Sequence, residues 1–122
     1  MSSTPGQAPI KLRVWQQNLN KSRVAQEDLI NSDVHKNYDA MLLQEPFIDA
    51  FGNTKSTRNW RVVYPLSWLL DPAPPRAVIL VSATLDTNSW AQVHITGTWD
   101  LVAIRFTGPL VVLFHTIFTM IA

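Results

Sequence analysis

The sequence of 122 residues contains no cysteine, and only 16% of its residues are charged. Without cysteine the chain forms no disulfide bond and offers no thiolate to a metal. The formal net charge of +1 provides no broad basic field, so any contact with nucleic acid has to come from local groups. These absences leave the cellular location unknown, with an intracellular site, nuclear or cytoplasmic, compatible with the composition.

A long apolar run is also missing. The longest, Leu110–Ala122, is shorter than the roughly 20 apolar residues that a membrane-spanning helix needs, so no membrane span is predicted. The polar stretch at residues 1–9 lacks the apolar core of a secretory signal and is predicted to be a flexible leader. Residues 10–122 are predicted to form one domain.

Material for a hydrophobic core is abundant. Hydrophobic residues make up 47% of the chain and include five Trp and five Phe, which excludes a disordered segment. The length allows one modest domain. Base-stacking roles for the tryptophans are conceivable, but aromatic residues in an apolar chain of this kind are expected mostly in the core.

The first half of the sequence predicts a strand, a helix and a second strand. Residues Leu12–Gln17 suit a strand with one exposed face, and Ala40–Gln44 is apolar on both faces until its last residue. Between them, Ser22 is expected to cap a helix over Arg23–Lys36. The apolar face of this helix is predicted to comprise Val24, Ala25, Leu29, Ile30 and Val34. We therefore predict an α/β fold with a βαβ opening.

The second half predicts antiparallel strands. A polar loop over Asp49–Asn59 contains Gly52 and the cations Lys55 and Arg58, and a proline-rich loop follows Pro65. A meander is predicted from the strands Trp60–Tyr64, Arg76–Ala83, Trp90–Ile95, Asp100–Phe106 and Leu110–Phe118. Together with Arg61, the two loop cations could touch a DNA backbone, although scattered cations are usually a solvated surface.

Two polar residues stand where predicted strands end. Glu45 directly follows the buried run Ala40–Gln44, and Asn18 follows Leu12–Gln17. Strands of an α/β sheet commonly deliver ligand-binding and metal-binding groups to one edge. The alternative stays open that Glu45 is a solvated carboxylate before Pro46 and that Asn18 is an ordinary turn residue.

Four blocks carry a resemblance to a known family. They are Val14-Trp15-Gln16-Gln17-Asn18-Leu19-Asn20, Asp39-Ala40-Met41-Leu42-Leu43-Gln44-Glu45-Pro46, Arg76-Ala77-Val78-Ile79-Leu80-Val81 and Asp100-Leu101-Val102-Ala103-Ile104-Arg105-Phe106. In this order they resemble the endonuclease/exonuclease/phosphatase superfamily, which has the DNase I-like fold. Within this superfamily, the sequence most resembles the apurinic-type endonuclease domain of LINE-type (non-LTR) retrotransposons. The motifs that carry this resemblance are Gln44-Glu45-Pro46 and Trp60-Arg61-Val62-Val63-Tyr64-Pro65.

The resemblance implies a Mg²⁺-dependent phosphodiesterase that acts on DNA. In that case Glu45 is the metal-ligating glutamate, and Asn18 helps to hold the metal and phosphate region. One well-placed carboxylate is a credible protein share for Mg²⁺, which prefers oxygen ligands and keeps several waters. The ion would stabilise charge on the phosphoryl and leaving oxygens while an activated water attacks.

The sequence departs from the family near its end. The resemblance implies an Asp/Asn pair and a Ser-Asp-His ending that supplies the general base, and neither follows Leu113 in this chain. The resemblance therefore implies that residues 10–122 form a partial domain of this family, truncated at its C-terminus. About half of the family's four-layer sandwich is expected here, with little or no activity by itself. Ser32-Asp33-Val34-His35 lies too early to be that ending, and a lone histidine such as His115 is more often structural than catalytic.

Half a sandwich is expected to leave the inner face of a sheet uncovered. That face is predicted to contain Val78, Leu80, Val102, Ile104, Val111 and Leu113. An uncovered face favours self-association or a partner chain, which makes a non-catalytic binding or assembly module the alternative function. A relic of a superfamily phosphatase is a third reading, although no substrate pocket for it is visible in the sequence.

Overall fold

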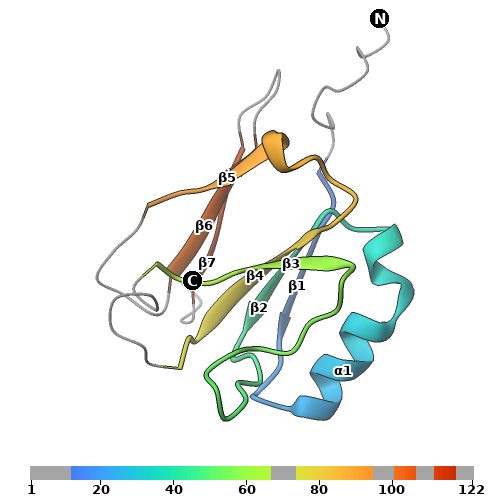
Figure 1. Cartoon of the computed structure of the whole chain (residues 1–122), viewed down its shortest axis with the longest axis vertical. Helices are drawn as coiled ribbons and strands as arrows, with labels where there is room; N and C mark the ends of the chain where they lie inside the picture. The colour runs from blue at the N-terminus through green and yellow to red at the C-terminus, as the bar shows by residue number, and fades with distance from the viewer. Residues whose placement is uncertain (1–11, 67–73, 95–100, 107–111, 118–122) are drawn as a thin grey trace, which may run out of the picture.

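The computed structural model describes residues 12–66, 74–94, 101–106 and 112–117 (Figure 1). Strand β1 (Val14–Asn18) is followed by helix α1 (Arg23–Asn31), the short 3₁₀ helix η1 (Asp33–Lys36) and strand β2 (Ala40–Gln44). Strands β1 and β2 pair in parallel, as a right-handed βαβ connection would allow. The predicted βαβ opening is confirmed, and β2 has the predicted bounds.

Helix α1 begins as predicted but ends earlier. The Ser22 side chain accepts a hydrogen bond from the backbone N–H of Ala25 at 3.1 Å, which caps the first turn. The prediction that the helix continues to Lys36 is wrong, because Ser32 interrupts it. The Ser32 hydroxyl donates to the Leu29 carbonyl at 2.7 Å and accepts from the N–H of Val34, so the chain continues as η1.

The face that α1 buries also differs from the prediction. Val24 is 68% exposed, whereas Gln26 is fully buried together with Leu29 and Ile30. Apolar spacing assigned Val24 to the core, but Gln26 takes the buried position because its amide finds hydrogen-bond partners there.

The remaining strands divide between two sheets. They are β3 (Trp60–Val63), β4 (Ala77–Ser82), β5 (Trp90–Gln92), β6 (Leu101–Phe106) and β7 (Val112–Ile117), with a 3₁₀ turn η2 (Thr87–Ser89) before β5. The first sheet has the order β1-β2-β4-β3, and the second has the order β5-β6-β7. The predicted antiparallel meander is confirmed in two parts, because β3 pairs antiparallel with β4 and β5, β6 and β7 pair antiparallel in order. It is not continuous, because β4 and β5 lie in different sheets.

The first sheet is covered on both faces (Figure 1). On one face, α1 packs Leu29 and Ile30 in a cluster with Met41, Leu43, Trp60, Val78 and Leu80. On the other face, the second sheet packs Val102, Ile104 and Phe106 in a cluster with Ala40, Leu42, Val63, Ala77, Ile79 and Val81. The described chain is therefore layered as helix, sheet and sheet.

This layering corrects the prediction of an uncovered face. Val78, Leu80, Val102 and Ile104 are each at most 1% exposed. The prediction failed because it placed these residues on one surface, whereas they lie in two separate interlayer cores. Val111 and the side chain of Leu113 lie outside the described residues. No helix among the described residues is long and apolar enough to cross a membrane.

Candidate functional site

The ends of β1 and β2 bring the two predicted site residues to one edge of the sheet. Asn18 is the register partner of Gln44, and the chains stay joined beyond that pair. The N–H of Leu19 donates to the Gln44 carbonyl at 2.9 Å, and the N–H of Lys21 donates to the Glu45 carbonyl at 2.8 Å. The sequence-based prediction that both residues reach the same edge is consistent with this pairing.

Glu45 has an unusual backbone and a partly enclosed side chain. Its φ of 50° is left-handed, a conformation that costs a non-glycine residue about 1–2 kcal/mol. Its N–H donates to the Arg76 carbonyl at 2.9 Å, which fixes the residue against the start of β4. The side chain is only 17% exposed, and its Oε2 is buried without a hydrogen bond. Strain of this kind is often retained where it aims a functional group.

Arg76 supplies the cation that faces this carboxylate. Its Nε lies 3.7 Å from Glu45 Oε2, and the Arg76 side chain is 47% exposed. The contact is an ion pair rather than a hydrogen bond, so the carboxylate charge is partly balanced while Oε2 accepts no hydrogen bond. Sequence reasoning did not identify Arg76 as a site residue, although it directly precedes a buried strand, just as Glu45 directly follows one.

Asn18 is exposed and forms a turn. Its Oδ1 accepts a hydrogen bond from the N–H of Asn20 at 2.9 Å, and Asn20 and Lys21 both have left-handed φ values of 51° and 62°. The turn-forming alternative for Asn18 is thus present in the structure. An amide oxygen has a second lone pair, so this bond leaves Asn18 able to contribute to a ligand as well.

A cleft adjoins Glu45. It has a volume of about 600 Å³ and lies between the β1–α1 turn, the segment after Glu45 and the segment before β4. Its walls are mainly apolar, with two cations and one carboxylate among the described lining residues: Lys21, Pro46, Phe47, Ile48, Asp49, Pro74, Pro75 and Arg76. The combination of apolar walls and few charged groups is typical of ligand sites.

Gln26 holds the segment that forms one wall of this cleft. Its Nε2 donates to Thr54 Oγ1 and to the Lys55 carbonyl, both at 2.7 Å, and its Oε1 accepts from the N–H of Phe47 at 2.8 Å. Thr54 Oγ1 donates in turn to the Phe47 carbonyl at 2.8 Å. The loop after Glu45 is therefore fastened to α1 by a buried, fully paired amide. A glutamine within a predicted helix gives no sequence signal for this role of Gln26.

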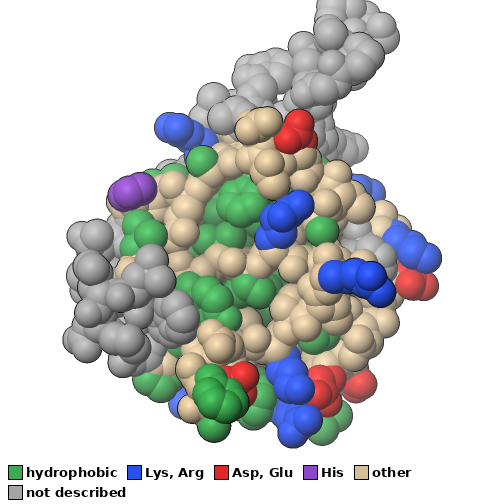
Figure 2. Space-filling model, in the orientation of Figure 1, with side chains coloured by type: hydrophobic (Ala, Val, Ile, Leu, Met, Phe, Trp, Pro, Cys, Tyr) green, Lys and Arg blue, Asp and Glu red, His purple; other side chains and the backbone are tan. Residues whose placement is uncertain are grey.

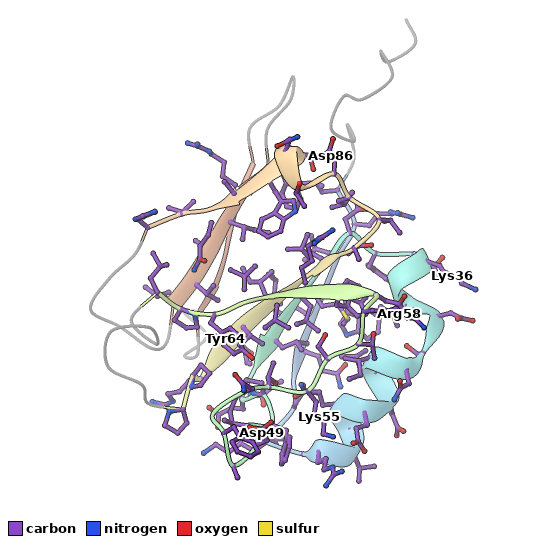
Figure 3. All side chains as sticks on the ribbon, in the orientation of Figure 1. Lys36, Asp49, Lys55, Arg58, Tyr64 and Asp86 are labelled. Atoms are coloured by element: carbon purple, nitrogen blue, oxygen red, sulfur yellow. The ribbon has the colours of Figure 1, made fainter. Side chains whose placement is uncertain are left out.

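The other candidate groups lie elsewhere. Helix α1 starts beside the site and runs away from it, so η1 with Lys36 lies far from Asp49 (Figure 3). The backbone of His35 belongs to η1, and that of His115 pairs with Ala103 in the second sheet. Their side chains lie outside the described residues. Neither histidine side chain is therefore described beside Glu45, and Asp49 is the carboxylate described among the residues that line the adjoining cleft.

The predicted DNA-facing cations do not act as one group. Lys55 forms an ion pair with Glu27 at 3.6 Å, whereas Arg58 and Arg61 are exposed. Figure 2 shows the Lys and Arg side chains spread over this face of the described residues, with acidic side chains among them. This distribution agrees with a solvated surface, as the sequence favoured.

The donors at the sheet edge suit a hard divalent cation as a partial ligand set. Glu45 offers a buried carboxylate oxygen without a hydrogen bond, and Asn18 offers an amide oxygen. Among the described residues no group of three or more His, Asp or Glu side chains could hold a metal ion. A divalent cation held by these two oxygens would have to keep much of its hydration shell, as Mg²⁺ does.

A comparison with solved structures finds a related architecture. The endonuclease domain of TRAS1, a telomere-specific non-LTR retrotransposon, superposes with a TM-score of 0.64 at 20% sequence identity. The chain thus has part of the DNase I-like fold. The alignment covers 88% of this chain and 44% of the TRAS1 domain, so the chain spans less than half of that length. No protein-family model matches the sequence, and no curated protein matches it.

Proposed function

We propose that this chain supplies the metal-side half of a Mg²⁺-dependent endonuclease site, which cleaves phosphodiester bonds in DNA. The observation that carries the proposal is Glu45, a strand-end carboxylate on a left-handed backbone with a buried oxygen that accepts no hydrogen bond. The shared fold with the TRAS1 endonuclease domain supports the choice of reaction class. At 20% identity the likeness concerns the fold, so the activity rests on the geometry of the site.

Each residue at the sheet edge has a distinct part in this proposal. Glu45 would hold the ion, and Asn18 would orient its hydration shell or the phosphate through the amide. When bound, the ion would neutralise charge on the phosphoryl group. Arg76 places a positive charge 3.7 Å from the Glu45 carboxylate and partly balances its charge. Lys21, on the opposite wall of the cleft, adds a second positive charge for a phosphate.

The described site holds only part of a catalytic set. Phosphodiester hydrolysis also needs a base for the attacking water, and no histidine side chain is described beside Glu45. Removal of one member of such a set typically lowers the rate by about 10²- to 10⁴-fold. We therefore propose that these 122 residues alone turn over DNA slowly or not at all, and that their direct property is metal binding.

Metal binding tests the proposal without relying on turnover. In a Mn²⁺ titration followed by the electron paramagnetic resonance of the free ion, the unaltered chain should bind one ion, and Glu45→Gln should abolish that binding. Asp28→Asn is the matched control, because Asp28 is an exposed carboxylate on α1 away from the sheet edge. Equal Mn²⁺ binding by the unaltered chain and Glu45→Gln would falsify the assignment.

Supercoiled plasmid with Mg²⁺ provides the second readout. We expect little nicking by the unaltered chain. Robust nicking that disappears in Glu45→Gln would support the endonuclease site and overturn only the expectation of low activity.

The alternative function of an assembly module loses its main argument, because Val78, Leu80, Val102 and Ile104 are buried within the chain.

A further inference from the structure

Phe51 is the most exposed large hydrophobic residue among those described. Its side chain is 86% exposed, and Val24 at 68% is the other large hydrophobic side chain described as exposed. An isolated exposed apolar side chain needs no explanation by itself. Phe51 differs because its backbone N–H is held by the Asp49 side chain, and because the preceding residues Ile48 and Asp49 line the cleft beside Glu45.

The backbone around Phe51 forms a small hairpin, closed by a bridge between Ile48 and Thr54. Within it, Asp49 Oδ1 accepts hydrogen bonds from the N–H groups of Phe51 at 2.8 Å and Asn53 at 3.0 Å. The N–H of Asp49 donates to the Asn53 carbonyl at 2.8 Å. Gly52 follows Phe51 with a φ of 84°, a conformation that favours glycine. The tip is therefore preorganised and presents its aromatic ring without further ordering of the backbone.

The base of the hairpin is anchored in the core. Thr54 is 8% exposed, and its N–H donates to the Tyr64 hydroxyl at 3.0 Å while its own hydroxyl takes part in the Gln26 network. The labelled side chains of Asp49, Lys55 and Tyr64 lie around this end of the molecule in Figure 3. The hairpin that carries the exposed ring is therefore anchored to the core at its base.

Charge next to the hairpin indicates what the ring contacts. Ile48 and Asp49 line the cleft from the hairpin side, and Lys21 and Arg76 line it as the cations. Phosphates attract the cations, and a base offers a flat apolar face to an aromatic ring. A nucleic-acid strand that passes the Glu45 edge would satisfy both features, whereas a purely apolar protein partner would make no use of the cations Lys21 and Arg76.

We propose that Phe51 is a stacking contact for an unpaired DNA base, held by the Ile48–Thr54 hairpin beside the Glu45 cleft. The inference rests on the proposed function for its choice of DNA as ligand. It adds that the strand approaching Glu45 is single-stranded or locally unpaired, because a base inside a duplex does not offer its face to a side chain. Lys21 and Arg76 then contact the phosphates of the same strand.

Binding of a short fluorescein-labelled single-stranded oligodeoxynucleotide, followed by fluorescence anisotropy in EDTA, tests this proposal. EDTA removes metal ions, so neither cleavage nor Glu45 coordination contributes. Phe51→Ala should weaken binding by about tenfold or more, and Phe51→Trp should keep it, because both rings stack on bases. Val24→Ala is the matched control for loss of an exposed apolar side chain and should leave binding unchanged.

Salt dependence separates stacking from charge. Phe51→Ala should leave the slope of log affinity against log salt unchanged, whereas Arg76→Gln should reduce it by about 1. A fully paired duplex of the same length should respond little to Phe51→Ala. Equal single-strand binding by Phe51→Ala and the unaltered chain overturns the proposal, as does failure of the unaltered chain to bind DNA.

The outcomes distinguish this proposal from the metal site. If Mn²⁺ binds through Glu45 but Phe51→Ala binds DNA normally, only the stacking role fails. If Phe51→Ala instead abolishes a dimer seen by size-exclusion chromatography while DNA binding persists, the ring contacts a second copy of the chain. Because Phe51 is 86% exposed, its replacement should leave the circular dichroism spectrum and unfolding midpoint unchanged.

Discussion

Arg76 Nε and Glu45 Oε2 lie 3.7 Å apart at the adjoining ends of β4 and β2. The Glu45 side chain is mostly buried, whereas the Arg76 side chain is about half exposed. The Glu45 N–H also donates a hydrogen bond to the Arg76 carbonyl. The arginine therefore places a positive charge beside the carboxylate, where it repels a cation that approaches Glu45. This repulsion should give Arg76 a measurable influence on the proposed metal site.

Replacement of Arg76 by Gln should increase the affinity for Mn²⁺. Loss of the positive charge removes a repulsion that we estimate to be worth about tenfold in affinity at a partly exposed site. The free energy of unfolding should fall by about 1 kcal/mol or less, because the arginine is 47% exposed and the ion pair is screened by water.

Mn²⁺ titration and urea unfolding measure these two effects. Arg61→Gln is the matched control. Arg61 is an exposed cation on β3, and its register partner Val81 lies near the end of β4 that is remote from Arg76. An unchanged Mn²⁺ affinity in Arg76→Gln would mean that the arginine does not influence the site.

The sequence was informative where a pattern is local. Ala40–Gln44 is apolar throughout, and it forms a strand with the predicted bounds because both faces are covered. Ser22 has a short polar side chain before an amphipathic run, and it caps the helix. Glu45 and Asn18 reach one edge because parallel strands joined by a helix end on the same side.

Long-range pairing was not predictable from these patterns. The position of β4 between β2 and β3 depends on partners that are distant in sequence. A strand that is apolar on both faces has the same sequence pattern at every central position of a sheet, so the pattern does not reveal its neighbours. The two separate cores followed from that position, so the expected open face was wrong. Arg76 and Gln26 were missed because their roles arise from contacts with Glu45 and Phe47 that no spacing reveals.

The neighbouring residues Leu80 and Ile79 test the two cores separately. Both are fully buried, Leu80 in the cluster with α1 and Ile79 in the cluster with the second sheet. Leu80→Ala and Ile79→Ala should each lower the free energy of unfolding by about 3 kcal/mol, through lost burial and the cavity that remains.

Urea unfolding gives these values, with Val24→Ala as the control expected to change stability by at most about 0.5 kcal/mol. A negligible effect of Ile79→Ala beside a large effect of Leu80→Ala would contradict the packing of the second sheet on the first.

Gln26→Leu should destabilise the chain although it makes the core more apolar. The substitution leaves the N–H of Phe47 and the Lys55 carbonyl without their partner, and each buried polar group left unpaired costs about 1–3 kcal/mol. We expect a loss of about 3 kcal/mol in urea unfolding. Asp28→Leu, the same kind of change on the exposed side of α1, should have little effect.

The loop also provides a second readout for Gln26. Its loss should increase amide hydrogen exchange over residues 47–55, which the side chain fastens to α1, before it affects β2 or β4. Uniform acceleration across the whole chain would indicate that Gln26 supports global stability without holding the loop specifically.

Tyr64 should make the stability of the chain fall in alkaline solution. Burial raises the pKa of its hydroxyl above the ordinary value, the hydrogen bond from the N–H of Thr54 opposes that rise, and the Asp49 carboxylate adds to it. The folded chain therefore keeps the proton at a pH where the unfolded chain releases it. Because the folded state then binds more protons, the free energy of unfolding decreases as pH rises above about 10.

Tyr64→Phe tests that sign. Phenylalanine cannot accept the hydrogen bond from Thr54, so the variant should be less stable by about 1 kcal/mol near neutral pH. The difference between the two chains should then shrink as pH rises above about 10, because only the unaltered chain loses stability through this hydroxyl. Urea unfolding midpoints at neutral and alkaline pH measure the difference, and comparison of the two chains cancels contributions from the other titrating groups. A difference that stays constant or widens in alkaline solution would contradict the assigned burial of Tyr64 beneath the hairpin.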